Sequence, residues 1–253
     1  MKSLFLSVAV VALALGSAGA HAQGEITLLS PNPIKETVDK LVADFEAKSG
    51  VKVKITYGSG VGTRKTVAEG KALDVTLLFA PFDDALKTGN VEKSSATVVA
   101  RLRLAIAVKK GAPKPDISTV AAVKNTLLNA KSIISVDPIQ GSVGGATLLA
   151  LDKMGITNQV EPKIKWVPGG GEVQTSVARG ETEIALGPYL SDMRNPGLNV
   201  VGALPPEAAT PVDITGFLST TVTDPKTAQA LLAYLKSAEA APVWEEAKAF
   251  PVR

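Results

Sequence analysis

Residues 25–50 of the chain read EITLLSPNPIKETVDKLVADFEAKSG. The short run Glu25–Leu29 predicts a strand, and from Ile34 to Lys48 the apolar side chains recur at the three- and four-residue spacing of an amphipathic helix. Asn32 is a suitable N-cap, Pro33 suits the first helical position, and Gly50 can end the helix. This stretch therefore predicts one strand–loop–helix unit.

The same unit recurs along the chain. Further strands are predicted at 51–57, 74–79, 132–136, 163–167 and 184–186, and further helices at 63–69, 145–153 and 172–179. Strands that alternate with helices of this length are typical of parallel α/β sheets. We therefore predict an α/β fold.

Glycine, serine and proline gather in the four loops that lead from a strand into a helix. These loops are Ser30–Pro33, Gly58–Arg64, Gln140–Gly144 and Pro168–Glu172. A helix N-terminus has backbone N–H groups without intrahelical partners and a partial positive charge, so it can hold an anion. In an open α/β sheet such loops lie beyond the carboxyl ends of the strands, where ligands bind. We therefore predict an anion site with contacts from Asn32, Ser59, Gly60, Ser142, Val143 and Gly171.

Composition excludes several chemistries. The chain has no cysteine, and its one histidine is His21. If the N-terminal segment is removed, a Ser-His-Asp triad, a thiol nucleophile and a His/Cys zinc site are all impossible. We therefore expect ligand binding without a metal or cofactor. The formal net charge of +3 comes from interleaved acids and bases, which is not the footprint of a nucleic-acid-binding protein.

The N-terminus has the pattern of a secretory signal peptide. Lys2 supplies the positive region, Leu4–Leu15 the apolar region, and Ala20-His21-Ala22 the small-x-small cleavage pattern. The apolar run is too short for a membrane anchor, which needs roughly 20 residues. We expect residues 1–22 to be the signal peptide, Gln23 to begin the mature chain, and the mature protein to be released into a periplasm.

Motifs spread over the mature chain carry a family resemblance. They are Phe45–Val53, the loop around Ser59, Val67–Asp74, Val136–Pro138 with the Gly-rich loop that follows, Tyr189–Asp192, and Leu231–Leu235 with Phe250. This pattern resembles type-2 periplasmic substrate-binding proteins of ABC importers, and among them the molybdate-binding branch. The resemblance implies two lobes, each a mainly parallel sheet flanked by helices, with the ligand in a cleft between them. It also implies capture of a small anion such as molybdate or tungstate.

Departures from the family pattern bear on the ligand. Pro33 stands where the family has an oxyanion-binding serine, so both a hydroxyl and a backbone N–H are absent there. Gly60 replaces a second serine, and Tyr189 matches the family's ligand-contacting tyrosine. Arg64 is predicted in the first turn of the next helix. Either it grips a carboxylate bidentately, or it lies on a solvent-exposed helix face. A small di- or tricarboxylate is therefore the alternative ligand.

The resemblance also implies an organisation and partners. We expect residues 24–100 plus 210–253 to form lobe 1 and residues 101–209 to form lobe 2, with the hinge near Ala100-Arg101 and Thr210–Val212. The expected partner is an inner-membrane permease, and the receptor is expected to be a monomer. Delivery to a sensor instead of an importer stays open.

A periplasmic enzyme such as a hydrolase is the rival class. Its candidate carboxylates would be Asp83 with Asp84, or Glu181 with Glu183. The first pair has the character of an exposed turn, and the second flanks a helix end at Gly180. A sugar ligand is disfavoured because Phe45, Phe79, Phe217, Tyr234 and Trp244 fall on core-like positions. Of the four aromatics that border the loops (Tyr57, Phe82, Trp166 and Tyr189), we expect all except Tyr189 to pack.

Overall fold

The computed structural model describes residues 24–71, 73–139, 143–189 and 195–252. The strands are β1 (Glu25–Pro31), β2 (Lys52–Gly58), β3 (Val75–Phe79), β4 (Thr97–Leu102), β5 (Leu104–Lys109), β6 (Ile133–Val136), β7 (Ile164–Val167), β8 (Ile184–Pro188), β9 (Leu198–Ala203), β10 (Val212–Leu218) and β11 (Ala249–Pro251). The α-helices are α1 (Lys35–Ser49), α2 (Gly60–Ala68), α3 (Asp83–Leu86), α4 (Val120–Asn129), α5 (Gly144–Lys153), α6 (Thr157–Val160), α7 (Gly170–Arg179), α8 (Pro225–Lys236) and α9 (Ala241–Glu246). Short 3₁₀ turns are η1 (Asn32–Ile34), η2 (Lys93–Ser95) and η3 (Glu161–Lys163).

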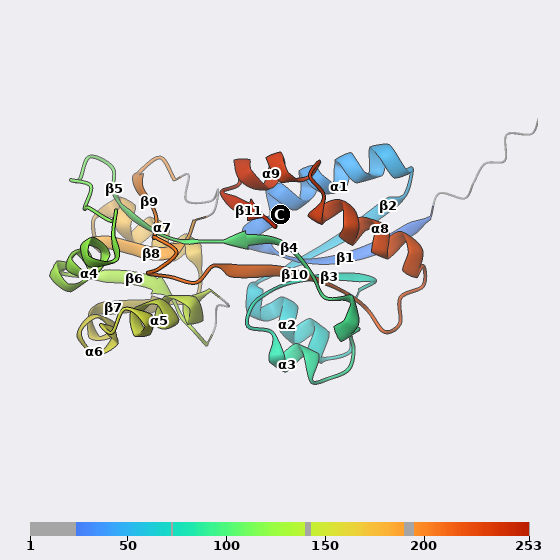
Figure 1. Ribbon diagram of the computed structural model, residues 1–253, viewed down its shortest axis with the longest axis horizontal. Helices are drawn as coiled ribbons and strands as arrows, with labels where there is room; N and C mark the ends of the chain where they lie inside the picture. Colours follow the sequence, from blue (N-terminus) through green and yellow to red (C-terminus); the bar gives the residue numbers. More distant parts are fainter. Residues whose placement is uncertain (1–23, 72, 140–142, 190–194, 253) are drawn as a thin grey trace, which may run out of the picture.

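The strands form two sheets with helices on both faces (Figure 1). The first sheet has the order β11-β4-β10-β3-β1-β2, and the second has the order β7-β6-β8-β5-β9. β1, β2 and β3 are parallel, as are β6, β7 and β8, so the predicted α/β units are confirmed. Antiparallel strands complete each sheet, namely β4, β10 and β11 in the first and β5 and β9 in the second.

The chain changes sheets at two places. It passes from the first sheet to the second at Arg103, which lies between β4 and β5, and it returns between Ala203 and Val212. We call the region around these two crossings the sheet junction. Strand direction brings the carboxyl ends of β1, β2 and β3 to the junction side of the first sheet. The carboxyl ends of β6, β7 and β8 likewise lie at the junction side of the second.

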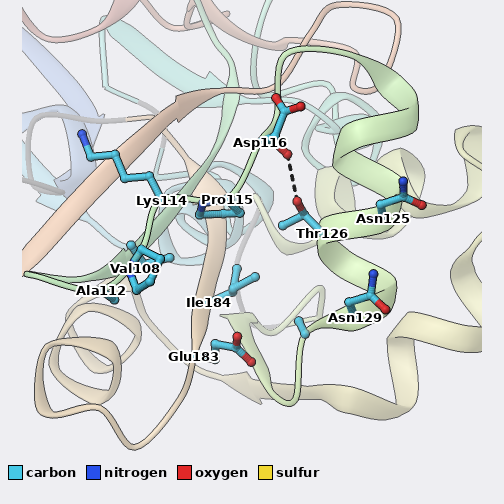
Figure 2. Close-up of a pocket in the computed structure, with 12 residues that line it drawn as sticks. Val108, Ala112, Lys114, Pro115, Asp116, Asn125, Thr126, Asn129, Glu183 and Ile184 are labelled. Atoms are coloured by element: carbon cyan, nitrogen blue, oxygen red, sulfur yellow. Dashed lines mark hydrogen bonds between the residues drawn. The ribbon is translucent and has the colours of Figure 1, made fainter.

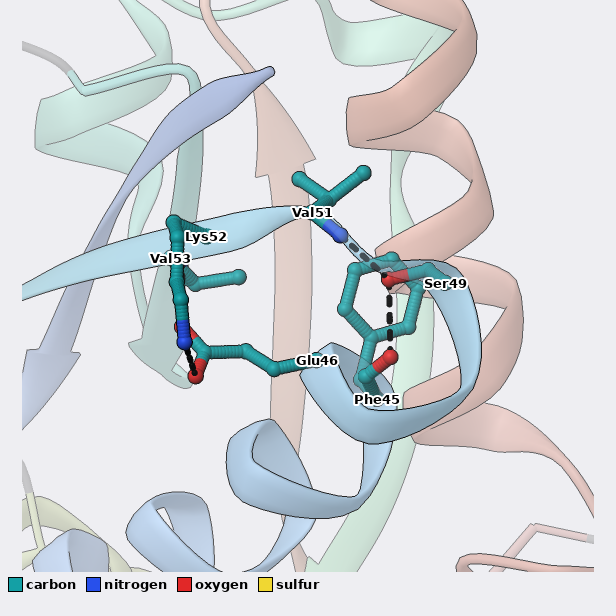
Figure 3. Close-up of polar contacts among 6 residues, drawn as sticks. All are labelled: Phe45, Glu46, Ser49, Val51, Lys52 and Val53. Carbon is teal, nitrogen blue, oxygen red and sulfur yellow. Dashed lines mark hydrogen bonds and ion pairs between the residues drawn. The ribbon is translucent and has the colours of Figure 1, made fainter. Parts of the chain in front are cut away.

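The turn from α1 into β2 shows how local sequence fixes the first unit (Figure 3). Gly50 ends α1 with a φ of 71°, a left-handed value that glycine adopts at little cost. The Ser49 hydroxyl donates to the Phe45 carbonyl and accepts from the backbone N–H of Val51. The Glu46 carboxylate accepts from the Val53 N–H at 2.7 Å, which ties the helix to the strand. The α1 face that holds Phe45 packs into the core, as the helical spacing predicts.

Two details of the predicted elements need correction. Asn32 is not an N-cap: it lies within η1, and its main-chain carbonyl already accepts the Lys35 N–H that a capping side chain would bind. Helix α2 begins at Gly60, three residues earlier than predicted, because the Ser59 hydroxyl caps the Gly62 N–H. Arg64 therefore belongs to the second turn of α2.

The predicted signal peptide, residues 1–22, and Gln23 lie outside the described residues. Across the ranges from Gly24 to Val252 that the structure covers, no helix combines the length and apolarity of a membrane span.

Candidate functional site

The four strand-to-helix loops that the sequence singled out all follow strands that end at the sheet junction. η1 follows β1, α2 follows β2, α5 follows the β6 loop and α7 follows β7. Helix N-termini from both sheets are therefore directed toward one region, where their free N–H groups favour negative charge. Because the chain crosses between the two sheets there, this region is the candidate binding site.

Ser59 and Gly60 form the start of α2. The Ser59 side chain is exposed, and its oxygen accepts the Gly62 N–H at 2.9 Å. A hydroxyl that accepts in this way keeps its own proton free to donate. The N–H groups of Gly60 and Val61 lie in the first turn, where the helix offers them no acceptor. This turn can therefore donate both a hydroxyl and backbone N–H groups to an anion.

Arg64 is not on a solvent-exposed helix face, because only 12% of its side chain is exposed. Its Nη1 donates to the Pro81 carbonyl oxygen at 2.6 Å, in the loop that follows β3. Its Nε is buried without a hydrogen-bond partner, and the nearest carboxylate oxygen, Oδ2 of Asp84, lies 3.8 Å away. The guanidinium thus reaches from α2 to the loop after β3, and its Nε has donor capacity left over.

The second sheet contributes two helix N-termini. Val143 is the buried N-cap residue of α5, and Gly144 lies so close to β6 that an added Cβ would be 2.2 Å from the Val136 carbonyl oxygen. Gly171 is the exposed second residue of α7, whose N-cap, Gly169, is extended. Both helices therefore begin directly beyond the carboxyl ends of their strands. Ser142 lies outside the described residues, as do Leu190, Ser191 and Asp192 of the tyrosine motif.

Tyr189 and Asn32 complete the predicted set. Tyr189 follows β8, is partly buried, and donates its backbone N–H to the Arg103 carbonyl oxygen at 2.7 Å, so it lies beside the first crossing. Asn32 is exposed at the end of β1. Each described member of the predicted set thus follows a strand that ends at the junction, whether in the first sheet or the second.

Of the other loop-bordering aromatics, Phe82 and Trp166 pack, as expected, and Tyr57 is partly buried. Phe82 stacks edge-on against Phe217, with ring centroids 5.1 Å apart, and Trp166 packs against the core. The Tyr57 hydroxyl donates to Asp39, whose second oxygen accepts from Lys35. Burial, together with that hydrogen bond, raises the pKa of Tyr57 well above its usual range.

A cavity of about 450 Å³ lies elsewhere, at the end of the second sheet remote from the junction (Figure 2). Its lining includes Val108 at the end of β5 and Ile184 at the start of β8, whereas the junction lies at the opposite ends of these strands. The Thr126 hydroxyl in its wall donates to the main-chain oxygen of Asp116, and the Glu183 carboxylate accepts from the Lys131 N–H. These side chains in the cavity wall are hydrogen-bonded within local turns. No helix N-terminus of the predicted anion site lines this cavity.

Sequence reasoning missed the contributions of Pro81 and Arg103. Pro81 contacts Arg64 through its main-chain oxygen, and residue type does not indicate such a contact. Arg103 is the single residue between β4 and β5, outside the strands and helices predicted from the sequence. The continuous apolar run of residues 104–108 was the available signal.

Two α/β sheets joined by two crossings, with strand carboxyl ends and helix N-termini at the junction, define the two-lobed fold of type-2 periplasmic binding proteins. The chain belongs to the bacterial extracellular solute-binding protein family, whose model matches residues 26–247.

Named relatives span several ligands. A curated protein from Pseudomonas sp, aconitate isomerase, is 30% identical over 234 residues, which cover 90% of this chain and 88% of the relative. The Azotobacter vinelandii periplasmic molybdate-binding protein has a TM-score of 0.66 at 14% identity and covers 90% of this chain and 100% of its own. The sulfate-binding protein of Mycobacterium tuberculosis has a TM-score of 0.72 at 20% identity, with coverages of 90% and 87%. The two structural likenesses establish the fold.

Proposed function

We propose that this chain is a periplasmic receptor of an ABC importer that captures a small di- or tricarboxylate at the sheet junction and presents it to a membrane permease. Membership of the solute-binding family supports the receptor role. The helix N-termini at the junction support an anionic ligand. In this proposal, residues before Arg103 and after Val212 form one lobe, the intervening chain forms the other, and the two crossings form the hinge.

Arg64 is the observation that carries the carboxylate class. Its guanidinium is mostly buried and is oriented by the Pro81 carbonyl. A planar guanidinium fixed in this way matches a carboxylate with two parallel hydrogen bonds, whereas a cage for a tetrahedral oxyanion can use neutral donors alone. Pro33 removes one neutral donor from the first loop. Both features favour a planar carboxylate.

The relative named aconitate isomerase supports the same class. Aconitate is a tricarboxylate, and this relative is 30% identical over most of both chains. The molybdate-binding structure shares only 14% identity with this chain. A tricarboxylate is therefore our first candidate ligand.

Molybdate or tungstate is the second candidate. The sequence motifs resemble the molybdate-binding branch, and Ser59 and the first turns of α2, α5 and α7 are neutral donors of the kind an oxyanion cage needs. In such a cage Ser59 would matter more than Arg64.

Isomerisation of a bound carboxylate is a third candidate, favoured by the relative's name and by a carboxylate near Arg64. Asp84 Oδ2 lies 3.8 Å from Arg64 Nε and would be the available base for proton abstraction. We propose binding without turnover, because the Asp84 side chain is 66% exposed and no second acid–base group pairs with it among the described contacts.

A melting-temperature screen followed by calorimetry tests the proposal. Propane-1,2,3-tricarboxylate, aconitate, glutarate, molybdate, sulfate, glucose and glutamine form the panel, and a true ligand should raise the Tm because it binds only the folded state. Arg64→Ala should weaken tricarboxylate binding by about 2 to 5 kcal/mol, as expected for a desolvated charge partner. Ser59→Ala is the matched variant on the same helix.

The outcomes separate the candidates. Molybdate binding that depends on Ser59 but not on Arg64 would establish the second candidate and refute the first. Conversion of cis- to trans-aconitate, followed by NMR and abolished in Asp84→Asn, would establish the third. Stabilisation by glucose or glutamine alone would refute an anion receptor.

A further inference from the structure

Arg103 is the feature of the junction that the proposed site leaves unexplained. The arginines at described positions are Arg64, Arg101, Arg103 and Arg179. Arg64, Arg101 and Arg179 each have a carboxylate oxygen within 4 Å. Arg103 has no such carboxylate among the described residues, although it is partly buried and its Nε is fully enclosed without a hydrogen-bond partner.

The contacts of Arg103 satisfy only part of its hydrogen-bonding capacity. Its Nη2 donates to the Leu204 carbonyl oxygen at 2.7 Å, and its guanidinium lies 5.2 Å from the centroid of the Phe250 ring. A neutral carbonyl and a ring face orient a cation but do not neutralise it. A partly buried charge with no carboxylate partner among the described residues is costly, so its presence points to an anion that arrives with the ligand.

The place of Arg103 in the sheets puts it on the same side of the first sheet as Arg64. Asp213 shares a face of β10 with Phe217, which packs in the cluster beneath α2 and α3. Arg101 and Phe250 lie opposite Asp213 in register, so they share that face, and the Arg103 guanidinium covers the Phe250 ring. The face that carries α2, and with it Arg64, therefore also carries Arg103.

Neighbouring strands of the first sheet connect the Arg64 anchor with Arg103. The N–H of Ala80, which precedes the Arg64 partner Pro81, donates to the Asp213 carbonyl on β10, and β10 pairs with β4. Two strand spacings, ~10 Å of backbone, thus separate the Arg64 anchor from the strand that leads into Arg103. Tyr189 bonds the Arg103 carbonyl through its N–H, so the tyrosine expected to contact ligand lies beside it.

We propose that Arg103 binds a second carboxylate of the ligand, so that Arg64 and Arg103 together select polycarboxylates over monocarboxylates. This inference rests on the proposed carboxylate receptor function and names the residue that sets its specificity. A ligand with one carboxylate can bind only one of the two guanidinium groups and leaves the other without a ligand carboxylate.

Calorimetry on the full mature chain with propane-1,2,3-tricarboxylate and with butyrate tests the inference. In Arg103→Gln we expect the affinity for the tricarboxylate to fall at least ~30-fold and the tricarboxylate-to-butyrate affinity ratio to fall at least tenfold. Arg103→Lys keeps the charge but loses the fork geometry, so it should recover part of the loss. Arg179→Gln is the matched control, because Arg179 is the last residue of α7 and already has the Glu181 carboxylate at 3.7 Å, and it should change the affinity less than threefold.

A structural role alone would give a different result. If Arg103 only joins the two crossings, Arg103→Gln should weaken both ligands equally and leave the affinity ratio unchanged, which would overturn the inference. Should Arg103→Gln not fold, as judged by its unliganded melting curve, the same ratio is measured in Arg103→Lys. If the folded variant binds the tricarboxylate with wild-type affinity, the role of Arg103 is refuted but the proposed receptor function is not. If the wild type does not bind the tricarboxylate, the proposed function is refuted as well.

Discussion

The Asp74 carboxylate accepts two hydrogen bonds from Thr27, one from its backbone nitrogen at 2.8 Å and one from its hydroxyl at 2.7 Å. Its other oxygen accepts from the backbone nitrogen of Thr223, in the segment before α8. One side chain at the start of β3 therefore ties together the start of β1 and the entry to a C-terminal helix. This end of the first sheet is the end remote from the junction, so the role of Asp74 is structural.

Asp74→Asn should lower the free energy of unfolding by about 1 to 3 kcal/mol, because an amide presents a donor to Thr27 groups that also donate. Burial raises the pKa of Asp74, but the hydrogen bonds from Thr27 and Thr223 outweigh it and hold the pKa below its ordinary value. This stabilisation is therefore complete above the unfolded pKa, near 4, and is lost as pH falls through the folded pKa. Urea unfolding of wild type and Asp74→Asn at pH 7 and pH 3 should show the difference shrinking at pH 3.

Gly144→Ala should damage the second sheet. The new Cβ would lie 2.2 Å from the Val136 oxygen and 2.6 Å from the Pro138 nitrogen, and these main-chain atoms cannot yield as a side chain could. We expect a loss of more than ~2 kcal/mol in unfolding free energy, measured by urea denaturation.

Gly145→Ala is the control for this clash. Gly145 is the next residue of α5, and a Cβ there meets nothing within 4 Å. It should be neutral or stabilising by up to about 1 kcal/mol, since alanine favours helix. Equal stability of the two variants would contradict the packing of α5 against β6.

Glu46→Gln should weaken the link between α1 and β2. The hydrogen bond from the Val53 N–H is the main cause that lowers the pKa of Glu46, with a smaller contribution from Lys52. We expect a loss of about 1 kcal/mol at pH 7 that disappears as pH falls through the folded pKa, since only the carboxylate form is favoured. Lys52→Met is the comparison: the ion pair is largely exposed and should contribute less than ~0.5 kcal/mol. A larger effect from Lys52→Met would assign the stabilisation to the ion pair.

Ligand binding should bring the two sheets closer. A ligand held by residues on both sides of the junction favours the closed arrangement by its differential affinity for that state. Small-angle scattering should therefore give a smaller radius of gyration with saturating tricarboxylate than without. Arg64→Ala at the same ligand concentration should keep the unliganded radius. A ligand that binds tightly to the wild type without changing its radius would contradict hinge closure.

Most of the parallel framework could be predicted from the sequence. The stretch 25–50 encodes its strand by apolar content, its helix by spacing and its helix end by Gly50, and each of these signals is local. The four loops could be identified for the same reason, because glycine, serine or proline between a strand pattern and a helix pattern marks a strand–helix junction wherever the strands lie. The prediction that Asn32 is an N-cap was wrong because the Lys35 N–H bonds to the Asn32 main-chain carbonyl. Residue preferences at helix N-termini do not encode this main-chain bond.

The environment of the charged side chains was decided by the tertiary structure. The sequence left Arg64 open between a ligand contact and an exposed helix face, and only the tertiary structure shows its side chain mostly buried and bonded to the Pro81 carbonyl of the next loop. Arg103 has no motif at all. Strand register determines its environment, because the pairing of β4 with β10 and β11 places Arg101 opposite the Asp213 carboxylate and leaves Arg103 beside none of the described carboxylates. Local sequence can determine which elements form, but the partners of a buried charge are set by strands far away along the chain.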